Sequence, residues 1–281
     1  MPIRLVAVDL DGTLIDHRLQ MNPRDRQALR AAVAAGVQVV IATGRMFRSS
    51  LPYAQELGLS GPIINYQGAV VREISSGQVL YRCELALPML RRALEYAEPR
   101  GWHVNAYLDE EVYTERASPE ADLYARVSMV PYHVVGPLSR WLNRESTKLV
   151  LVDLDPQEVP GRMAELDAWM SGIARVTRSL DWFIEVVNPQ VSKASALALV
   201  AARLGVDRSE VCAIGDNVND QEMIEWAGLG AVMRTAPAGL RERAAFTTST
   251  PEEGGVAEVL TRFVLGQNTP PRPASGSVAG A

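Results

Sequence analysis

Short apolar runs alternate with helix-like stretches at the start of the chain. Residues 5–8, 37–41 and 62–65 are rich in Val, Ile and Leu, as expected of strands buried on both faces of a parallel sheet. Between the first two runs, Asn22-Pro23 marks the start of a helix and Gly36 marks its end. A second helical stretch reaches to about residue 57. This alternation predicts an α/β fold with a doubly wound, Rossmann-like parallel sheet.

The pattern changes in the middle of the chain. Residues 69–85 indicate a hairpin around a Ser75-Ser76-Gly77 turn, and short strands and helices in mixed order follow it. The strand–helix alternation returns after Asn188-Pro189, with a helix at 193–204 and an apolar strand at 211–214. We therefore predict an inserted α+β cap domain at residues 83–187, within a discontinuous core made of residues 1–82 and 188–265. Residues 266–281 are rich in Pro, Gly, Ser and Ala, which predicts a disordered tail.

Composition narrows the class of protein. The chain has 281 residues, 47% of them hydrophobic, and a net charge of -5, so it offers no basic footprint for nucleic acid or an anionic membrane. It has only two cysteines, and no apolar stretch approaches the length of a membrane span. Met1 lies a few residues before the first strand, which leaves no room for a signal peptide. We expect a cytoplasmic protein, either a monomer or a homodimer.

Candidate functional residues follow four of the predicted elements. Open α/β sheets bind their ligands at the carboxyl ends of the strands, and these residues fall at that edge. In chain order they are Asp9 and Asp11 after the first strand, Thr43 and Gly44 after the second, Lys193 at the start of a helix, and Asp216, Asn219 and Asp220 after the strand at 211–214.

Two acids end the first strand. Asp9 and Asp11 are two positions apart, so an extended backbone points both side chains to the same side. Like charges at the end of a buried strand repel each other, and a cation or hydrogen-bond donors would stabilise them. The alternative is an Asp-Gly turn with two solvated acids.

Thr43-Gly44 and Lys193 are candidates for binding an anion. The first opens a helix, whose N–H groups and dipole favour negative charge, although it is also a plausible simple N-cap. A lysine in the first turn of a helix opposes the dipole, at a cost of about 0.5 kcal/mol. We therefore expect Lys193 to face an anion or carboxylates, the alternative being a solvated side chain.

The remaining acids point to a metal. Asp216 and Asp220 bring the number of acids at this edge to four, with Asn219 between them as a hydrogen-bonding group or an N-cap. Such a group requires a cation, and oxygen ligands without a nearby His or Cys favour Mg²⁺. Mg²⁺ is therefore the expected cofactor.

Taken together, these motifs resemble the haloacid dehalogenase-like (HAD) phosphatase superfamily. The resemblance rests on four segments in the same order: Asp9-Leu10-Asp11-Gly12-Thr13, Thr43-Gly44-Arg45, Lys193 and Gly215-Asp216-Asn217-Val218-Asn219-Asp220. The segments at 64–69 and 252–257 look like those of its Cof-type members. Because the long insert lies between Thr43 and Lys193, the chain is similar to the subgroup with a C2-type α/β cap.

The resemblance implies a mechanism and roles for the candidate residues. Asp9 is implied as the nucleophile that forms an aspartyl-phosphate, and Asp11 as the general acid and base. Mg²⁺ is implied to bind the Asp9 side chain, the Asp11 backbone carbonyl and Asp216. The phosphoryl oxygens would be held by Thr43, Gly44, Lys193 and Asn219. Asp220 is implied to orient Lys193 or metal-bound water rather than to bind the metal directly.

The expected function is hydrolysis of a small phosphate monoester. The substrate classes that fit are sugar phosphates, nucleotides or flavin mononucleotide, and pyridoxal phosphate. Two alternatives stay open, namely a phosphomutase of the same fold and a non-catalytic regulator that binds a metabolite. The physiological substrate and the cap residues that contact it are not fixed by the sequence. Arg234 either binds a second anionic group of the substrate or faces solvent.

Overall fold

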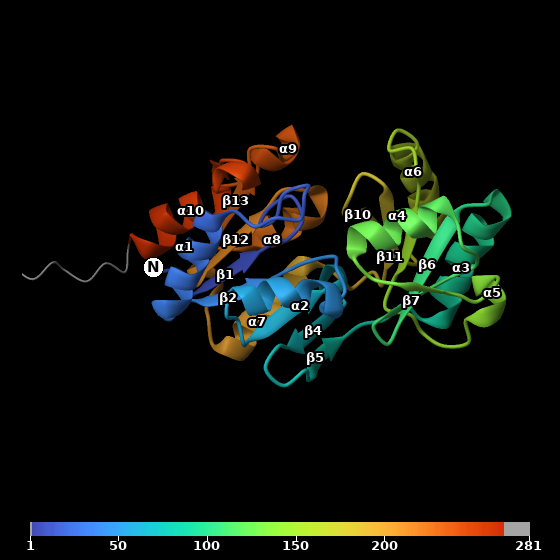
Figure 1. Cartoon of the computed structure of the whole chain (residues 1–281), viewed down its shortest axis with the longest axis horizontal. Helices are drawn as coiled ribbons and strands as arrows, with labels where there is room; N and C mark the ends of the chain where they lie inside the picture. The colour runs from blue at the N-terminus through green and yellow to red at the C-terminus, as the bar shows by residue number, and fades with distance from the viewer. Residues whose placement is uncertain (1, 267–281) are drawn as a thin grey trace, which may run out of the picture.

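The computed structural model describes residues 2–266, which form two large sheets side by side and a third, smaller sheet (Figure 1). The first sheet has five parallel strands in the order β14-β13-β12-β1-β2. Their bounds are β1 Leu5–Val8, β2 Gln38–Ile41, β12 Val211–Gly215, β13 Leu229–Met233 and β14 Phe246–Thr248. β1 is thus an interior strand, flanked by β2 from the first part of the chain and by β12 from the last part. The expected parallel α/β sheet is confirmed.

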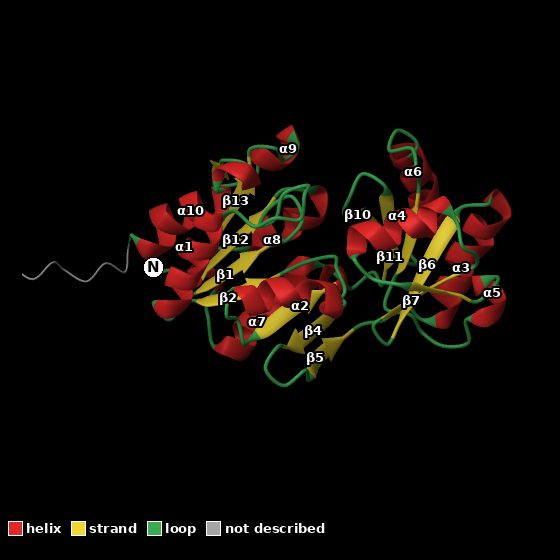
Figure 2. Cartoon of the chain, viewed as in Figure 1, coloured by secondary structure: helices red, strands yellow, loops and turns green. Residues whose placement is uncertain are grey.

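Helices cover both faces of this sheet (Figure 2). Val6 and Val8 of β1 pack with helices α1 Pro23–Ala34, α2 Phe47–Glu56 and α10 Gly255–Val259. Leu5 and Ala7 point the other way, into a cluster with α7 Lys193–Leu204 and α8 Gln221–Trp226. Because successive strand residues face opposite sides, burial of all four residues requires a layer on each face. The apolar run at residues 5–8 therefore marks an interior strand that is covered on both faces.

The third predicted strand is placed differently from the sequence expectation. β3 Pro62–Asn65 pairs antiparallel with β4 Val70–Glu73, which pairs in turn with β5 Val79–Arg82 in a small sheet of its own. A bridge between Ala42 and Ile64 joins it to the main sheet at the end of β2. An apolar run predicts a buried strand but not its partner, which explains the difference. The backbone N–H of Thr43 donates to the Ile64 carbonyl at 2.9 Å, so this sheet holds the segment after β3 beside Thr43.

The second large sheet lies within the residues predicted as the cap. Its strand order is β10-β11-β9-β6-β7-β8, antiparallel except for β7 and β8. The bounds are β6 His103–Leu108, β7 Glu111–Thr114, β8 Tyr132–Val134, β9 Leu149–Val152, β10 Arg175–Arg178 and β11 Phe183–Val187. We call it the cap sheet. The domain boundaries themselves stay a prediction.

The two faces of the cap sheet have different partners. Helices α3 Leu87–Ala97, α5 Leu138–Trp141 and α6 Val159–Met170 pack on one face. The other face packs with α4 Pro119–Ser128 and with Met46 and Tyr66 of the core. The cap sheet therefore turns this second face, with residues from β9 and β11, toward the carboxyl edge of the main sheet.

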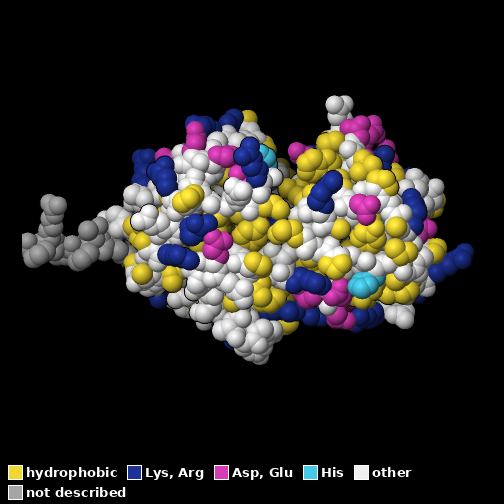
Figure 3. Space-filling model, viewed as in Figure 1, with side chains coloured by type: hydrophobic (Ala, Val, Ile, Leu, Met, Phe, Trp, Pro, Cys, Tyr) yellow, Lys and Arg dark blue, Asp and Glu magenta, His cyan; other side chains and the backbone are white. Residues whose placement is uncertain are grey.

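The remaining elements are short. They are α9 Ala238–Arg241, a π-helical turn at Leu260–Leu265, and 3₁₀ turns at Tyr66–Gly68, Glu98–Arg100, Arg208–Glu210, Val218–Asp220 and Pro251–Glu253. On the face shown in Figure 3, acidic and basic side chains are interspersed rather than gathered by sign. Within residues 2–266, every helix is too short or too polar to cross a lipid bilayer. The predicted tail, apart from Gly266, lies outside the described residues.

Candidate active site

The site is built at the carboxyl end of β1. The Asp9 side chain is buried there, and its backbone N–H donates to the carbonyl of Ile214 in β12 at 2.9 Å. Gly12 turns the chain with a positive φ of 79°, and a Cβ at this position would lie 2.5 Å from the carboxylate of Asp216. Only glycine fits both requirements. The loop after β1 can therefore run directly against the loop after β12.

Lys193 joins the two loops. Its side chain is fully buried, and its Nζ contacts a carboxylate oxygen of Asp9 and lies 2.6 Å from Oδ1 of Asp220. Burial alone would lower the pKa of Lys193, but the carboxylates of Asp220 and Asp9 outweigh burial and raise that pKa above its ordinary value. The structure thus places this lysine against two carboxylates, as its position in the first turn of α7 led us to expect.

Three carboxylates gather around this point. Oxygens of Asp9, Asp216 and Asp220 lie within 4.8 Å of one another. Burial, followed by repulsion from Asp220, raises the pKa of Asp9 well above its ordinary value and that of Asp216 to about 7. Because Lys193 supplies only one positive charge, the cluster favours a further cation. A Thr13 hydroxyl donates to Asp216 at 2.8 Å, which holds this carboxylate in the cluster.

The Asp220 carboxylate contacts both the loop after β12 and Lys193. Its second carboxylate oxygen accepts hydrogen bonds from the backbone N–H groups of Asp216 and Asn217 at 3.0 and 3.1 Å. With both oxygens engaged, this residue fixes the loop after β12 and the position of Lys193 at the same time. The contact with Lys193 is the geometry that the implied orienting role of Asp220 requires, and the role itself stays a prediction.

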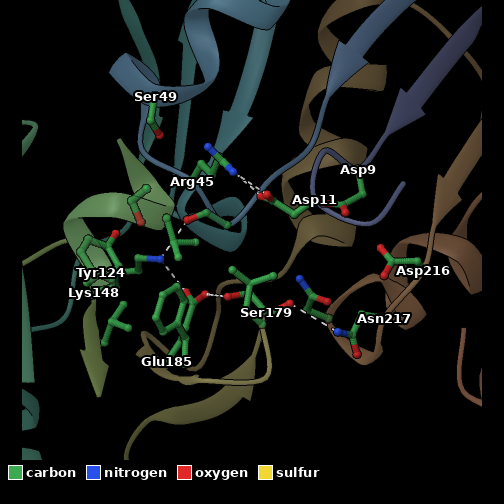
Figure 4. Close-up of a pocket in the computed structure, with 17 residues that line it drawn as sticks. Asp9, Asp11, Arg45, Ser49, Tyr124, Lys148, Ser179, Glu185, Asp216 and Asn217 are labelled. Atoms are coloured by element: carbon green, nitrogen blue, oxygen red, sulfur yellow. Dashed lines mark hydrogen bonds and ion pairs between the residues drawn. The ribbon is translucent and has the colours of Figure 1, made fainter. Parts of the chain in front are cut away.

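Asp11 lies apart from the acidic cluster. Its carboxylate forms a bidentate ion pair with Arg45, with N–O distances of 2.7 and 2.6 Å, and Figure 4 shows its side chain pointing toward that arginine. The Thr43 hydroxyl is buried and accepts from the backbone N–H of Arg45 at 3.1 Å, a local turn in the loop after β2. The expectation that Thr43-Gly44 opens or caps a helix is wrong, because α2 begins at Phe47 with Met46 as its N-cap. The third nitrogen of the guanidinium, Nη1, is buried without a hydrogen-bond partner among residues 2–266. It is a donor available to an anion.

Gly44 and Asn219 meet at Gln67. The Asn219 amide donates to the Gln67 side-chain oxygen at 3.1 Å. A Cβ on Gly44 would lie 2.4 Å from the Gln67 side-chain nitrogen, so glycine allows this close approach. The structure therefore brings together all the residues singled out at the carboxyl edge, with Arg45 and Gln67 added between them.

The cap closes over this edge. A cavity of about 30 Å³ lies between core and cap, and the cap side is formed by Tyr124, Lys148, Phe183 and Glu185 (Figure 4). A wider opening of about 300 Å³ adjoins it, lined by Arg178 of the cap and by Asp11, Asp216 and Thr235 of the core. Asn217 also donates to the Ser179 carbonyl of the cap at 3.3 Å. As it stands, the inner cavity has room for no more than a few waters.

The sequence analysis did not single out two charged residues of the cap, Lys148 and Glu185. Lys148 directly precedes the apolar run of β9. Glu185 lies inside the apolar run of β11, and a single charge within a buried strand is a signal that could have identified it. Arg234 forms an ion pair with Glu253 at 2.7 Å, and both side chains are more than half exposed, which agrees with the solvent-facing alternative.

Comparison with known proteins gives the family. The chain belongs to the haloacid dehalogenase-like hydrolase family, whose pattern matches residues 6–260. The 5-amino-6-(5-phospho-D-ribitylamino)uracil phosphatase YitU of Bacillus subtilis is 31% identical over 92% of this chain and 97% of its own length. A phosphoglycolate phosphatase of Methanothermobacter thermautotrophicus is 28% identical over 93% and 99%. A haloacid dehalogenase-like hydrolase of Bacteroides thetaiotaomicron superposes with a TM-score of 0.82 at 28% identity, covering 92% of this chain and 99% of that one. The protein is a Cof-type phosphatase of this family.

Proposed function

We propose that this phosphatase is a Mg²⁺-dependent phosphomonoesterase that works through an aspartyl-phosphate on Asp9. The observation that carries the proposal is the position of the Asp9 carboxylate, buried at the end of the interior strand β1 and in contact with Lys193. A carboxylate becomes an effective nucleophile for phosphorus when positive charge around it offsets the repulsion between the two anions. Lys193 supplies part of that charge, and a cation bound by the acidic cluster of Asp9 and Asp216 would supply the rest.

The residues present fit Mg²⁺. Carboxylate oxygens of Asp9 and Asp216 lie within 4.8 Å of each other, and burial raises the pKa of both side chains, which a divalent cation would reverse. We infer that Asp9, Asp216 and the Asp11 backbone carbonyl hold the metal, because Asp220 is already shared between Lys193 and two backbone N–H groups. Mg²⁺ would reduce the repulsion between the nucleophile and the phosphoryl oxygens.

In the first half-reaction, an oxygen of Asp9 attacks phosphorus in line with the leaving oxygen. The bond from phosphorus to Asp9 forms while the bond to the leaving oxygen breaks, and Asp11 gives that oxygen a proton. Negative charge on the phosphoryl oxygens is spread over Lys193, the Thr43 hydroxyl and the amides of Gly44 and Asn219. For this role Asp11 has to leave Arg45, with which it is paired as a carboxylate in this structure, and take up a proton from solvent before the step begins.

In the second half-reaction, water takes the place of the departed alcohol. Asp11 now accepts a proton from the water as its oxygen attacks phosphorus, and the bond to Asp9 breaks. Inorganic phosphate leaves and both aspartates return to their starting states. The same residue thus serves as acid in one step and as base in the other.

The substrate is proposed to be a small phosphorylated metabolite. Two relatives support this breadth, since one is named for a ribitylaminouracil phosphate and the other for phosphoglycolate. Sugar phosphates, nucleotides or flavin mononucleotide, and pyridoxal phosphate are the classes to test first. A cytoplasmic location and a monomeric or homodimeric state belong to the same proposal.

The experiment is phosphate release from a panel of these esters with Mg²⁺, with EDTA and Asp9→Asn as controls. We expect release from at least one ester, loss of release in EDTA, and loss of release in the folded variant. Retention of phosphate on the protein with transfer to a second sugar hydroxyl would assign a phosphomutase instead. Binding of esters without turnover would assign a regulator.

A further inference from the structure

A buried ion pair lies at the contact between the cap sheet and the core. The Nζ of Lys148 and Oε2 of Glu185 are 2.7 Å apart, and their side chains are 4% and 1% exposed. Glu185 of β11 lies opposite Val150 of β9, and Lys148 is two residues from Val150, so both side chains belong to the face that meets the core. Burying two charges costs several kcal/mol before they attract each other, so stability alone is a weak reason for such a pair.

Both members of the pair reach across to the core. Lys148 donates to the Gly44 carbonyl at 2.8 Å, and Glu185 accepts from the Gln67 side-chain nitrogen at 3.0 Å. The Gln67 oxygen in turn accepts from Asn219 at 3.1 Å. A continuous set of hydrogen bonds therefore joins the cap sheet to Gly44 and Asn219, two residues proposed above to hold the phosphoryl group.

Gln67 is held firmly in the middle of this set. It is 3% exposed, and its backbone has a positive φ of 60°, which is unfavourable for a residue with a side chain. Its backbone N–H donates to the Thr43 carbonyl at 3.1 Å. The next residue, Gly68, lies against the Ser192 carbonyl that precedes Lys193, where a Cβ would approach to 2.2 Å. Packing thus fixes this glutamine between two segments of the proposed phosphate site.

We propose that Lys148, Glu185 and Gln67 are positioning residues that make the phosphate site depend on closure of the cap. When the cap closes, the ion pair fixes the Gly44 peptide and, through Gln67, the Asn219 amide; when it opens, both connections break. Phosphoryl oxygens are therefore bound best in the closed state, where water is excluded. This inference rests on the proposed phosphate-binding role of Gly44 and Asn219.

The carboxylate of Glu185 is already occupied by protein groups, which favours positioning over contact with the leaving group. Its Oε1 accepts from Gln67 and from the Ser179 hydroxyl, while its Oε2 accepts from Lys148. Although the pair lines the inner cavity, none of these bonds leaves the carboxylate directed at an incoming alcohol.

Two variants test the proposal on the full-length protein. Gln67→Met removes the link between Glu185 and Asn219, and the double variant Lys148→Met/Glu185→Gln removes both charges together, so that neither is left unpaired. The matched control is Glu111→Gln, which breaks the half-exposed ion pair with Arg48 that also joins cap to core. Thermal unfolding establishes that each variant is folded, and the double variant decides the question if Gln67→Met is not.

The substrates separate the two roles. We expect kcat to fall about tenfold on acetyl phosphate and by a similar factor on the best larger ester, because the phosphoryl group is common to both. A loss confined to the larger ester would overturn the proposal and assign the pair to binding the leaving group. The Glu111→Gln control should stay within about twofold of the wild type, since exposed ion pairs contribute little.

Binding of inorganic phosphate in the presence of Mg²⁺, measured by calorimetry, gives a readout that does not need turnover. We expect about tenfold weaker binding in Gln67→Met and in the Lys148→Met/Glu185→Gln double variant, and wild-type binding in the control. Equal binding in all four proteins would overturn the proposal. A wild-type protein that binds phosphate but hydrolyses no ester would contradict the proposed activity. Weaker phosphate binding in the variants would, even then, support the positioning role of Lys148, Glu185 and Gln67.

Discussion

Asp11 is held by Arg45 through two parallel hydrogen bonds, from Nε to Oδ2 at 2.7 Å and from Nη2 to Oδ1 at 2.6 Å. Both side chains are largely buried, so the pair is shielded from solvent and from screening salt. The structure therefore shows Asp11, the proposed general acid, bound to Arg45 and pointing away from Asp9, the proposed nucleophile (Figure 4). Release of Asp11 from Arg45 becomes a step that substrate binding has to bring about.

Substitution of Asp11 should depend on the leaving group. Asp11→Asn keeps the shape of the side chain but cannot deliver a proton, so we expect a loss of about 10²–10⁴-fold in kcat for esters of sugar alcohols. An aryl phosphate such as p-nitrophenyl phosphate leaves without protonation in the first step, and its loss should be smaller. Single-turnover kinetics on both substrates measure this. Equal losses in the first step would argue against proton donation.

Removal of the Lys193 charge should affect both turnover and stability. Lys193→Met leaves Asp9 and Asp220 buried without their cation, and breaking a buried pair in this way costs about 3–5 kcal/mol. We expect the loss to be larger at neutral pH than near pH 5, because burial already raises the pKa of Asp9 well above its ordinary value and this carboxylate can take up a proton at the lower pH. Urea unfolding at the two pH values gives the difference, with Lys193→Arg as the control that keeps the charge. A loss independent of pH would mean that packing, not charge, is what Lys193 provides.

Mg²⁺ should stabilise the wild-type protein and not the Asp216→Asn variant. At a concentration 100 times its dissociation constant, a ligand that binds only the folded state adds about 2.7 kcal/mol. Without metal, the variant should be the more stable of the two, because it relieves repulsion that helps raise the Asp216 pKa to about 7. Thermal unfolding in EDTA and in Mg²⁺ measures both effects. A variant that is stabilised by Mg²⁺ as much as the wild type would exclude Asp216 as a ligand.

Asp25 should make stability depend on pH at a distance from the active site. It is fully buried in α1, its Oδ1 accepts from the Ala257 N–H at 2.6 Å, and burial raises its pKa from 3.8 to about 7. Because the pKa of Asp25 is higher in the folded state than in the unfolded chain, its protonation adds to the free energy of unfolding at low pH. This contribution is lost as the pH rises toward 7.

The slope attributable to Asp25 is at most about 1.4 kcal/mol per pH unit. Asp25→Asn keeps the acceptor for Ala257 and removes the titration, so its stability should fall less between about pH 5 and about pH 7. Urea unfolding of the two proteins in EDTA compares the slopes, and the contributions of Asp9 and Asp216 are common to both. Parallel slopes would show that Asp25 does not titrate in this range.

The parts of the site that could be predicted share a sequence signal. Asp9 and Asp216 directly follow apolar runs, and Lys193 opposes a helix dipole, so each residue conflicts with its local surroundings unless a partner is present. The structure supplies the partners in every case. The helix at Lys193–Leu204 was predicted with the same bounds, because Ser192 caps it at one end and Gly205 at the other.

What the sequence could not show is pairing between distant segments. The antiparallel partner of β3 and the meeting of Gln67 with Glu185 depend on tertiary placement, since local periodicity carries no information about which surfaces meet. Glu185 did interrupt an apolar run, but one charge in a strand does not reveal whether it faces solvent, a metal or another domain. Only the cap sheet, folded against the core, shows that it faces Gln67.

The strand order has a consequence for how the protein is made. β1, near the start of the chain, is hydrogen-bonded to β12, and the contact from Lys193 to Asp9 spans 184 residues of sequence. While the protein is being synthesised, β1, which leads to the proposed nucleophile Asp9, therefore has one unpaired edge until the last third of the chain emerges. The cap sheet, whose strands all lie in between, can form earlier. We expect a nascent chain with a folded cap and an incomplete active site, which gains the capacity for phosphoryl transfer only as its final segment docks.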